Sequence, residues 1–326
     1  MKRLWLIAFL VGLTTTTVSA QDLNLTQFYL TPAYLNPAFA GTTPEFRLAF
    51  HHRSQWNALE TTPQRQFASF EYNFITFDGG MSLTAGRTTL GGDARWQTFE
   101  ARGAYSQRVY LNYRWIIGAG LELAYVTGSL NQGDLIFEDQ LLSGNATRET
   151  LPAERSSYVD ANFGLTIYNK AFYAGLAVRN LTTPSLNAFG AEQNELERVF
   201  LVQIGYKAEL PFKNYITPAA LFRYQNSFYQ LDLGANWENE YVFTGLWYRG
   251  VPFLSGGVEN SVNQDAISLT AGAHLGAMTT VAFSYDINIA DYNTLGNSFE
   301  LSLLIAPKKN RTGRVGTHDI LCPITL

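Results

Sequence analysis

The sequence of 326 residues contains one cysteine, few charged residues and no long hydrophobic run. One cysteine permits no intramolecular disulfide, and no group of cysteines and histidines has the spacing of a zinc site. Charged residues make up 15% and aromatic residues 14% of the chain, a combination that excludes intrinsic disorder. A bundle of transmembrane helices is also excluded, because it needs runs of about 18 or more apolar residues.

Hydrophobic residues are nevertheless plentiful, at 46% of the chain, and they alternate with polar ones. The mean hydropathy is therefore close to zero, at -0.07. Together with 27 glycines, the many aromatic residues indicate a β-rich chain with an unusual surface. The formal net charge is -4, so the composition does not favour the basic face that a nucleic-acid partner requires.

Residues 1–20 have the three parts of a secretory signal peptide. A cationic start is followed by an apolar stretch at residues 4–13 and by small residues that end at Ala20. We expect cleavage after Ala20, because the apolar stretch is too short for a membrane anchor. Gln21, where a lipoprotein would have cysteine, argues against a lipid anchor. Removal of two basic residues with the signal peptide changes the net charge to -6.

Most of the chain after residue 44 repeats one pattern, an alternation of apolar and polar residues followed by a turn. Between Val281 and Ala290, for example, bulky apolar residues occupy the odd positions and small or polar residues the even positions. A period of two predicts strands with one apolar and one polar face. We expect about fourteen strands, at residues 45–56, 64–76, 79–90, 95–109, 113–127, 157–168, 171–181, 196–208, 214–225, 228–238, 240–250, 264–275, 279–290 and 297–306.

These strands are about twice as long as those of a soluble β-sandwich, which would show the same alternation. Short turns follow the even-numbered strands and mostly longer loops follow the odd-numbered ones, with Asn226-Ser227 as the exception. We therefore expect residues 44–306 to form an all-β transmembrane antiparallel barrel of the bacterial outer membrane, with both termini in the periplasm. Aromatic residues near strand ends fit the girdles of such barrels: Trp56, Trp96, Tyr110, Trp115, Trp237, Tyr241 and Trp247.

Several short motifs carry a resemblance to a known family. In chain order they are Gln27-Phe28-Tyr29, Asn36-Pro37-Ala38-Phe39-Ala40-Gly41, Arg53-Ser54-Gln55-Trp56, Phe283-Ser284-Tyr285-Asp286, Gly296-Asn297-Ser298-Phe299-Glu300 and Cys322-Pro323. The sequence resembles the PorP/SprF family of type IX secretion system membrane proteins on these motifs, of which the block from Asn36 to Gly41 is the most specific. It departs from the family pattern at Glu300, which no histidine precedes. The signature and partner-contact candidates are Asn36, Pro37, Ala38, Phe39, Gly41, Arg53, Gln55, Trp56, Asp286 and Glu300.

The resemblance implies an outer-membrane component that assists secretion or surface attachment of adhesins and gliding-type substrates. The implied partners are the periplasmic ring, the outer-membrane translocon and the C-terminal domain of a secreted adhesin. A member of the core machinery and a member dedicated to one adhesin both fit the sequence. The alternative function is an outer-membrane channel or transporter for small or hydrophobic solutes.

The segment at residues 21–43 is predicted to lie in the periplasm or to plug the lumen of the barrel, because its prolines and Gly41 disfavour a regular helix or strand. Alternatively, it is an unstructured leader. Seven charged residues are expected on the lumen face, either in ion pairs or as a selectivity filter: Glu71, Glu122, Asp160, Arg179, Asp232, Asp286 and Glu300.

The C-terminal tail at residues 307–326 carries Lys308, Lys309, Arg311 and Arg314, which either dock on a periplasmic partner or are simply solvated. Cys322 is either a free thiol or a link to another chain. Catalysis has little support and no cofactor is expected. The adjacent residues His51 and His52 point to opposite faces of a strand, and no nucleophile motif accompanies His274.

Overall fold

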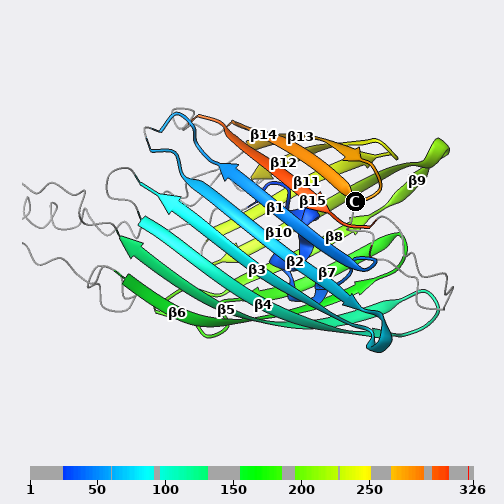
Figure 1. Ribbon diagram of the computed structural model, residues 1–326, viewed down its shortest axis with the longest axis horizontal. Coiled ribbons are helices and arrows are strands. Elements are labelled where there is room, and N and C mark those ends of the chain that lie inside the picture. Colours follow the sequence, from blue (N-terminus) through cyan, green and yellow to red (C-terminus); the bar gives the residue numbers. More distant parts are fainter. Residues whose placement is uncertain are drawn as a thin grey trace, which may run out of the picture.

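The computed structural model describes residues 25–59, 61–91, 96–130, 155–185, 195–226, 228–250, 266–289, 296–307 and 322. Most of them form one closed antiparallel sheet (Figure 1). The strands are β1 (Phe46–Ser54), β2 (Gln64–Phe74), β3 (Gly79–Leu90), β4 (Trp96–Tyr110), β5 (Ile116–Leu130), β6 (Arg155–Tyr168), β7 (Phe172–Arg179), β8 (Val199–Tyr206), β9 (Ala208–Leu210), β10 (Asn214–Gln225), β11 (Phe228–Glu238), β12 (Val242–Gly250), β13 (Ala266–Leu275), β14 (Thr279–Asn288) and β15 (Ser298–Ile305).

Apart from β8 and β9, neighbours in sequence pair with each other, and the pairing of β1 with β15 joins the first and last strands. β8 and β9 both pair with β10, so they occupy one position in the ring and the barrel has 14 strands. The expected transmembrane antiparallel barrel is thereby confirmed. The helices that the structure describes all fall short of the length and apolarity that a membrane span needs.

The prediction of a single strand at 196–208 is wrong in one respect, because the β-sheet hydrogen bonding is interrupted at Lys207. The Lys207 amide donates a hydrogen bond to the Ala171 carbonyl at 2.7 Å, toward the turn before β7, and β9 follows as a separate short strand. The next residues turn sharply, with Phe212 at a φ of 62° and Lys213 at 56°. Periodicity alone does not reveal such a break, because the alternation continues through it.

Burial alternates along the strands with bulky apolar residues outside and small or polar residues inside. In β5, for example, Leu123 is 67% exposed whereas the adjacent Glu122 is 3% exposed. A water-soluble barrel has the opposite arrangement, since it buries its apolar side chains. An apolar outer wall around a polar interior is the arrangement of a barrel that stands in a lipid bilayer.

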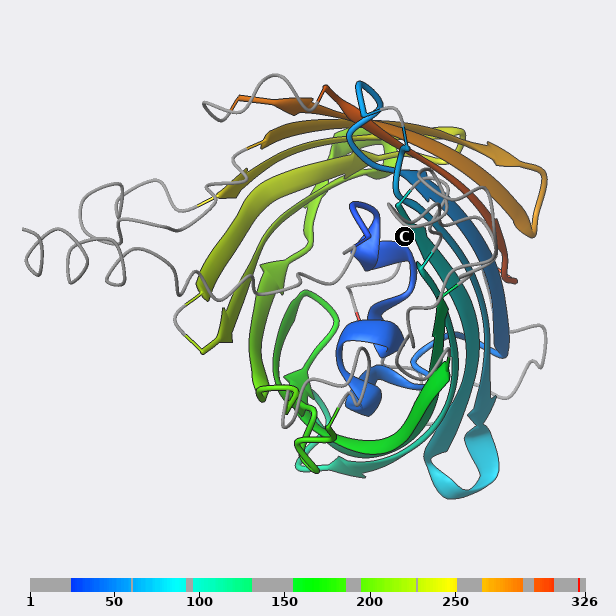
Figure 2. The same ribbon diagram turned by 90° about the vertical axis from the view of Figure 1, so that its left-hand side faces the viewer.

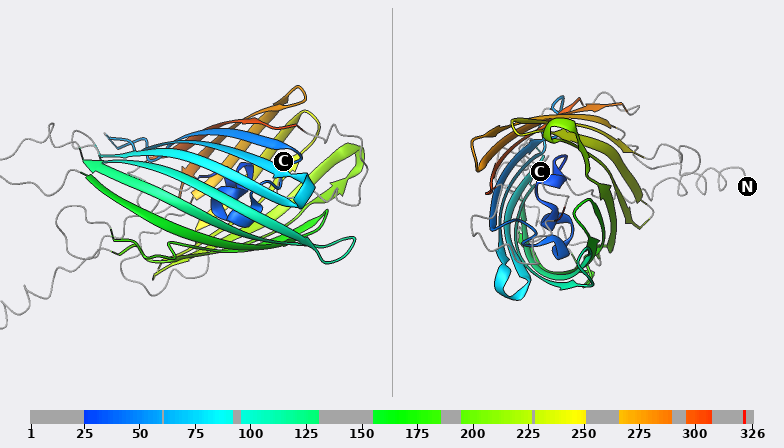
Figure 3. Two further views of the ribbon diagram at one scale, coloured as in Figure 1. Left: turned by 60° about the horizontal axis from the view of Figure 1, so that its bottom comes forward. Right: turned by 90° about the vertical axis from the view of Figure 1, so that its right-hand side faces the viewer.

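The chain before β1 lies inside this wall. Residues 25–43, which we call the lumen segment, form three short helical turns: η1 (Phe28–Leu30), α2 (Pro32–Leu35) and η2 (Pro37–Phe39). Every residue of the lumen segment is buried. Views toward either end of the barrel show these turns surrounded by the strands (Figures 2 and 3).

The outward face of β5 provides a test of the membrane orientation. Leu123 lies at the middle of β5 and Ser129 near its end. We predict that Leu123→Arg lowers the free energy of unfolding in lipid vesicles by about 2–4 kcal/mol, because it buries a charge near the bilayer midplane. The control Ser129→Arg should cost less than about 1 kcal/mol near the interface. Denaturant titration in vesicles measures both, and equal effects would contradict the orientation.

Candidate functional site

The signature block from Asn36 to Gly41 owes its shape to two prolines and one glycine. Pro32 and Pro37 each begin a helical turn, a position where a missing amide hydrogen has no cost. Asn36 is extended before Pro37, and its side-chain oxygen caps the turn by accepting a hydrogen bond from the Ala38 amide at 3.0 Å. Gly41, at a φ of 66°, then redirects the chain toward β1.

The block lies directly on the backbone of the barrel wall. The Asn36 side-chain Nδ2 donates hydrogen bonds to the carbonyls of Leu165 in β6 and Leu176 in β7, at 3.2 and 3.1 Å. Such close approach requires glycine beneath it. A Cβ atom on Gly164 would lie 1.9 Å from the Asn36 side-chain oxygen, and one on Gly120 would lie 2.4 Å from the Ala38 nitrogen.

The C-terminal end of the lumen segment is held by β4. The Ser106 hydroxyl donates to the Ala40 carbonyl at 2.7 Å, and the Arg108 guanidinium donates to the Gly41 carbonyl at 2.9 Å. Phe39 is fully buried and meets the Tyr173 ring edge-on, with 6.2 Å between ring centroids. All six residues of the signature block therefore face the barrel interior.

The N-terminal end of the lumen segment is held by a second group of contacts, centred on Glu300. Its carboxylate accepts hydrogen bonds from the amides of Thr26 at 2.7 Å and Gln27 at 3.3 Å. The Gln27 side chain donates to the Ser284 hydroxyl and to the Glu300 carbonyl, both at 3.1 Å. The Thr26 hydroxyl donates to Asp286 at 2.7 Å.

Two basic side chains of β1 complete this group. Arg53 forms ion pairs with Asp286 at 2.7 Å and with Glu300 at 3.5 Å. His51 lies 3.3 Å from Glu300. We call these residues the polar clamp: Thr26, Gln27, His51, Arg53, Ser284, Asp286 and Glu300. All of them are buried, so the acidic groups are stabilised by donors and not by water.

The polar clamp lies near the end of the barrel from which the long loops leave. Arg53 is one residue from the end of β1, and Glu300 is two residues after the start of β15. The lumen segment thus runs from the end with the long loops toward the opposite end, which carries the short turns and which we call the turn end. There Gly41 approaches Gly80. Residues 21–24 lie outside the described residues, and a periplasmic N-terminus stays a prediction.

His51 does not form a catalytic triad, although it contacts a carboxylate and a hydroxyl. Glu300 at 3.3 Å and Ser302 at 2.6 Å both approach the same ring nitrogen, Nδ1. A triad needs the carboxylate and the nucleophile on opposite nitrogens. Within the described ranges, no group of three or more His, Cys, Asp or Glu residues is placed to hold a metal ion.

Aromatic packing fills the remaining interior beside the polar clamp. Tyr29 stacks on Trp247 with 5.7 Å between ring centroids, and Phe28 meets the same indole edge-on at 5.0 Å. The assignment of Trp247 to an outer aromatic girdle is therefore wrong, since β12 turns this side chain inward.

Tyr34 lies among guanidinium groups. Arg65, Arg102 and Arg179 each lie within 5.1 to 5.4 Å of its ring centroid, where cations are attracted to the aromatic face. Arg65 also donates to the Tyr34 hydroxyl at 2.6 Å. Sequence reasoning missed Tyr34, because a tyrosine outside a regular strand carries no periodic signal.

The charges expected on the lumen face are all buried and have partners. Glu71 pairs with Arg47 at 3.2 Å, Glu122 with Arg102 at 3.2 Å, and Asp232 with Arg249 at 3.3 Å. Asp160 accepts hydrogen bonds from the Asn180 amide at 3.1 Å and the Thr182 hydroxyl at 2.8 Å. Arg179 is the third cation beside Tyr34.

Two signature candidates lie outside these contacts. The amide of Gln55 donates to the Pro63 carbonyl at 3.0 Å, and the amide of Trp56 donates to the Ser298 hydroxyl at 3.1 Å. They shape the first loop and its contact with β15. Cys322 is buried in a cluster with Phe39, Ile116, Tyr168 and Tyr173, whereas Lys308, Lys309, Arg311 and Arg314 lie outside the described residues.

Comparison with known proteins gives one family. The family model described as type IX secretion system membrane protein PorP/SprF matches residues 17–305. No curated relative matches the chain.

Among solved structures the chain is similar to several outer-membrane proteins at low identity. The Pseudomonas putida toluene transporter TodX has 9% identity and a TM-score of 0.48, with coverage of 86% of this chain and 93% of that chain. The Ralstonia pickettii toluene transporter TbuX has 11% identity and a TM-score of 0.47, with coverage of 84% and 93%. The Acinetobacter baumannii protein Omp33 has 7% identity and a TM-score of 0.46, with coverage of 80% and 97%.

Gly164 provides a test of how the signature block is held. We predict that Gly164→Ala loosens the lumen segment, because the new methyl group overlaps the Asn36 side chain and overpacking costs about 1–3 kcal/mol. Hydrogen exchange of peptides that cover residues 25–43 should become about tenfold faster. Gly103→Ala is the matched control, since its nearest contact would be an ordinary 3.7 Å.

Asn36→Ala separates a clash from a general loss of stability. Asn36→Ala removes the side-chain oxygen that would lie 1.9 Å from a Cβ atom on Gly164. Gly164→Ala should therefore have a smaller additional effect in the Asn36→Ala background than in the unchanged chain. Fully additive effects on exchange would show that the two residues do not act on each other.

Proposed function

The chain belongs to the PorP/SprF family of type IX secretion system membrane proteins, and we propose that it assists secretion or surface attachment of adhesin-type substrates. In this proposal it is a binding or assembly module that stands in the outer membrane. It contacts the periplasmic ring and the outer-membrane translocon, and it receives the C-terminal domain of the secreted adhesin. No catalytic step is assigned to it.

The observation that carries this proposal is the lumen segment in its polar clamp. A polypeptide that crossed this lumen would have to displace residues 25–43, and Asp286 and Glu300 would lose the hydrogen bonds that Thr26 and Gln27 donate to them. A buried acceptor that loses its donor typically costs about 1–3 kcal/mol, and more where the acceptor is charged. A stably filled interior supports a role in binding other proteins over a role as the conduit.

The turn end of the barrel supports contact with periplasmic machinery. Tyr113 in the turn between β4 and β5 is 94% exposed, and Phe212 after β9 is 95% exposed. Exposed aromatic residues of this kind are enriched where proteins bind one another. The basic tail at residues 307–326 is proposed to add an electrostatic contact on the same side.

Conductance tests the filled lumen. We predict that the purified barrel shows little single-channel conductance in planar bilayers, and that deletion of residues 22–43 raises it strongly, because it removes the segment that occupies the interior. A variant with Glu197→Gln, an exposed loop carboxylate, controls for a change of charge alone. Equal conductance with and without the segment would contradict a plug.

Affinity purification and gene deletion test the secretion role. The tagged barrel, solubilised from the outer membrane, should retain ring proteins or an adhesin C-terminal domain. Tyr113→Ser combined with Phe212→Ser should reduce retention of ring proteins by about tenfold or more, since it removes two exposed hot-spot side chains. Deletion of the gene should remove the adhesin from the cell surface and leave solute uptake intact. Lost uptake with normal surface proteins would favour a solute transporter instead.

A further inference from the structure

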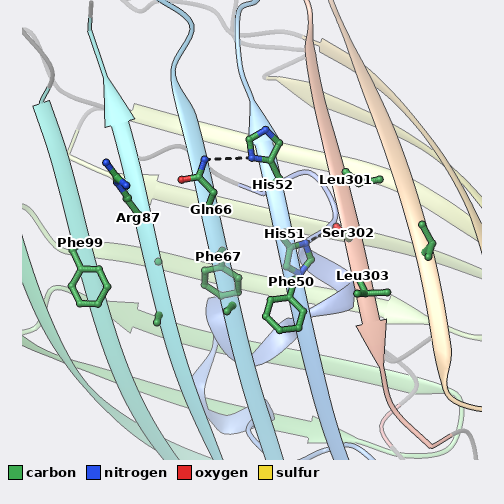
Figure 4. A pocket seen from close by; sticks show the side chains of 14 residues that line it. Phe50, His51, His52, Gln66, Phe67, Arg87, Phe99, Leu301, Ser302 and Leu303 are labelled. Atoms are coloured by element: carbon green, nitrogen blue, oxygen red, sulfur yellow. Dashed lines mark hydrogen bonds between the residues drawn. The ribbon is translucent and has the colours of Figure 1, made fainter. Parts of the chain in front are cut away.

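The outer wall of the barrel carries an apolar hollow that the secretion role does not use. It has a volume of about 640 Å³ and spreads over neighbouring strands from β14 through β15, β1, β2 and β3 to β4 (Figure 4). This size lies within the usual range for ligand pockets, roughly 300–1,000 Å³. We call it the outer hollow, after its outward-facing lining residues Phe50, Ala68, Ala85, Phe99 and Leu303.

The hollow arises from small residues between large ones. The strand register places Phe50 opposite Ala68, and Ala68 opposite Ala85. These two alanines form the floor, because their side chains are too short to fill the outer surface. Phe50 on one side and Phe99 on the other stand up from the wall as rims.

A row of polar side chains borders the hollow on the side of the long loops. His52, Gln66 and Arg87 lie opposite one another on β1, β2 and β3, and Figure 4 shows them above Phe50 and Phe99. His52 and Gln66 share a hydrogen bond at 3.4 Å. Arg87 is three residues from the end of β3, about 10 Å along the strand. This is the depth expected for the boundary between acyl chains and headgroups.

Arg87 is an unusual residue for this surface. Within the described strands it is the only charged side chain on the outward face that lies more than one residue from a strand end. It donates a hydrogen bond to Gln97 at 2.8 Å. No carboxylate of the described residues forms an ion pair with it. A cation facing lipid is costly unless an anion from the membrane meets it.

We infer that the outer hollow binds lipid A of the outer leaflet, with a lipid phosphate on Arg87 and an acyl chain over Ala68 and Ala85. A guanidinium binds phosphate through two parallel hydrogen bonds, and the alanine floor accepts a flexible hydrocarbon chain. The long-loop side of a bacterial barrel faces the outer leaflet, which selects lipid A over a phospholipid of the inner leaflet. This inference rests on the barrel fold and on its orientation in the membrane. It does not rest on the proposed role in secretion.

Binding of defined lipids to the purified full-length barrel tests this site. Lipid A is titrated against the delipidated protein in detergent, with native mass spectrometry as the readout. We expect Arg87→Gln to weaken binding about tenfold, the equivalent of one charge-assisted contact. Ala85→Phe should weaken it similarly by filling the floor. Arg114→Gln, which removes an exposed arginine at the turn end, should leave binding unchanged.

Two further lipids identify the source of the phosphate. Dephosphorylated lipid A should bind the unchanged barrel as weakly as lipid A binds the Arg87→Gln variant, and phosphatidylglycerol should bind more weakly than lipid A. Circular dichroism confirms that each variant retains its strands. Equal binding of lipid A to the unchanged barrel and to both variants would overturn the proposal. Equal affinity for phosphatidylglycerol and lipid A would also overturn it.

Discussion

Burial of the Glu300 carboxylate is the constraint on which the interior of this barrel depends. A charged group removed from water needs donors on all sides, and Glu300 receives them from the amides of Thr26 and Gln27 and from His51 and Arg53. The same logic extends around the lumen, where Glu71, Glu122 and Asp232 each have an arginine. The charges inside are thus part of a packed core and do not line open water.

The lumen segment and the wall are complementary in shape as well as in charge. Asn36 contacts strand carbonyls only because Gly164 leaves room above the backbone, and Trp247 points inward to stack on Tyr29. A bilayer requires apolar residues only on the outer face of the barrel. The residues of the inner face are therefore free to match the shape and polarity of the lumen segment. The result is a filled and hydrogen-bonded interior in a protein that belongs to a secretion-system family.

Much of the architecture was predictable from local pattern. The alternation of residues located all fourteen strand positions, because lipid on one side and a polar interior on the other impose a strict period of two. The break at Lys207 was missed, since hydrogen bonding and not polarity defines it. Trp247 was misplaced because a tryptophan near a strand end fits either face. The motif residues Gln27 and Glu300 were found separately, but no local rule predicts that residues 273 positions apart form hydrogen bonds with each other.

The polar clamp joins the lumen segment to the first and last strands of the barrel, where the ring closes. Its residues come from the lumen segment, from β1 and from β14 and β15, and β1 and β15 are the strands whose pairing closes the barrel. The N-terminal end of the lumen segment therefore has its full set of partners only in the closed ring, whereas its C-terminal end is held by β4, β6 and β7. Opening the ring between β1 and β15 would separate the donors of the polar clamp from its acidic acceptors.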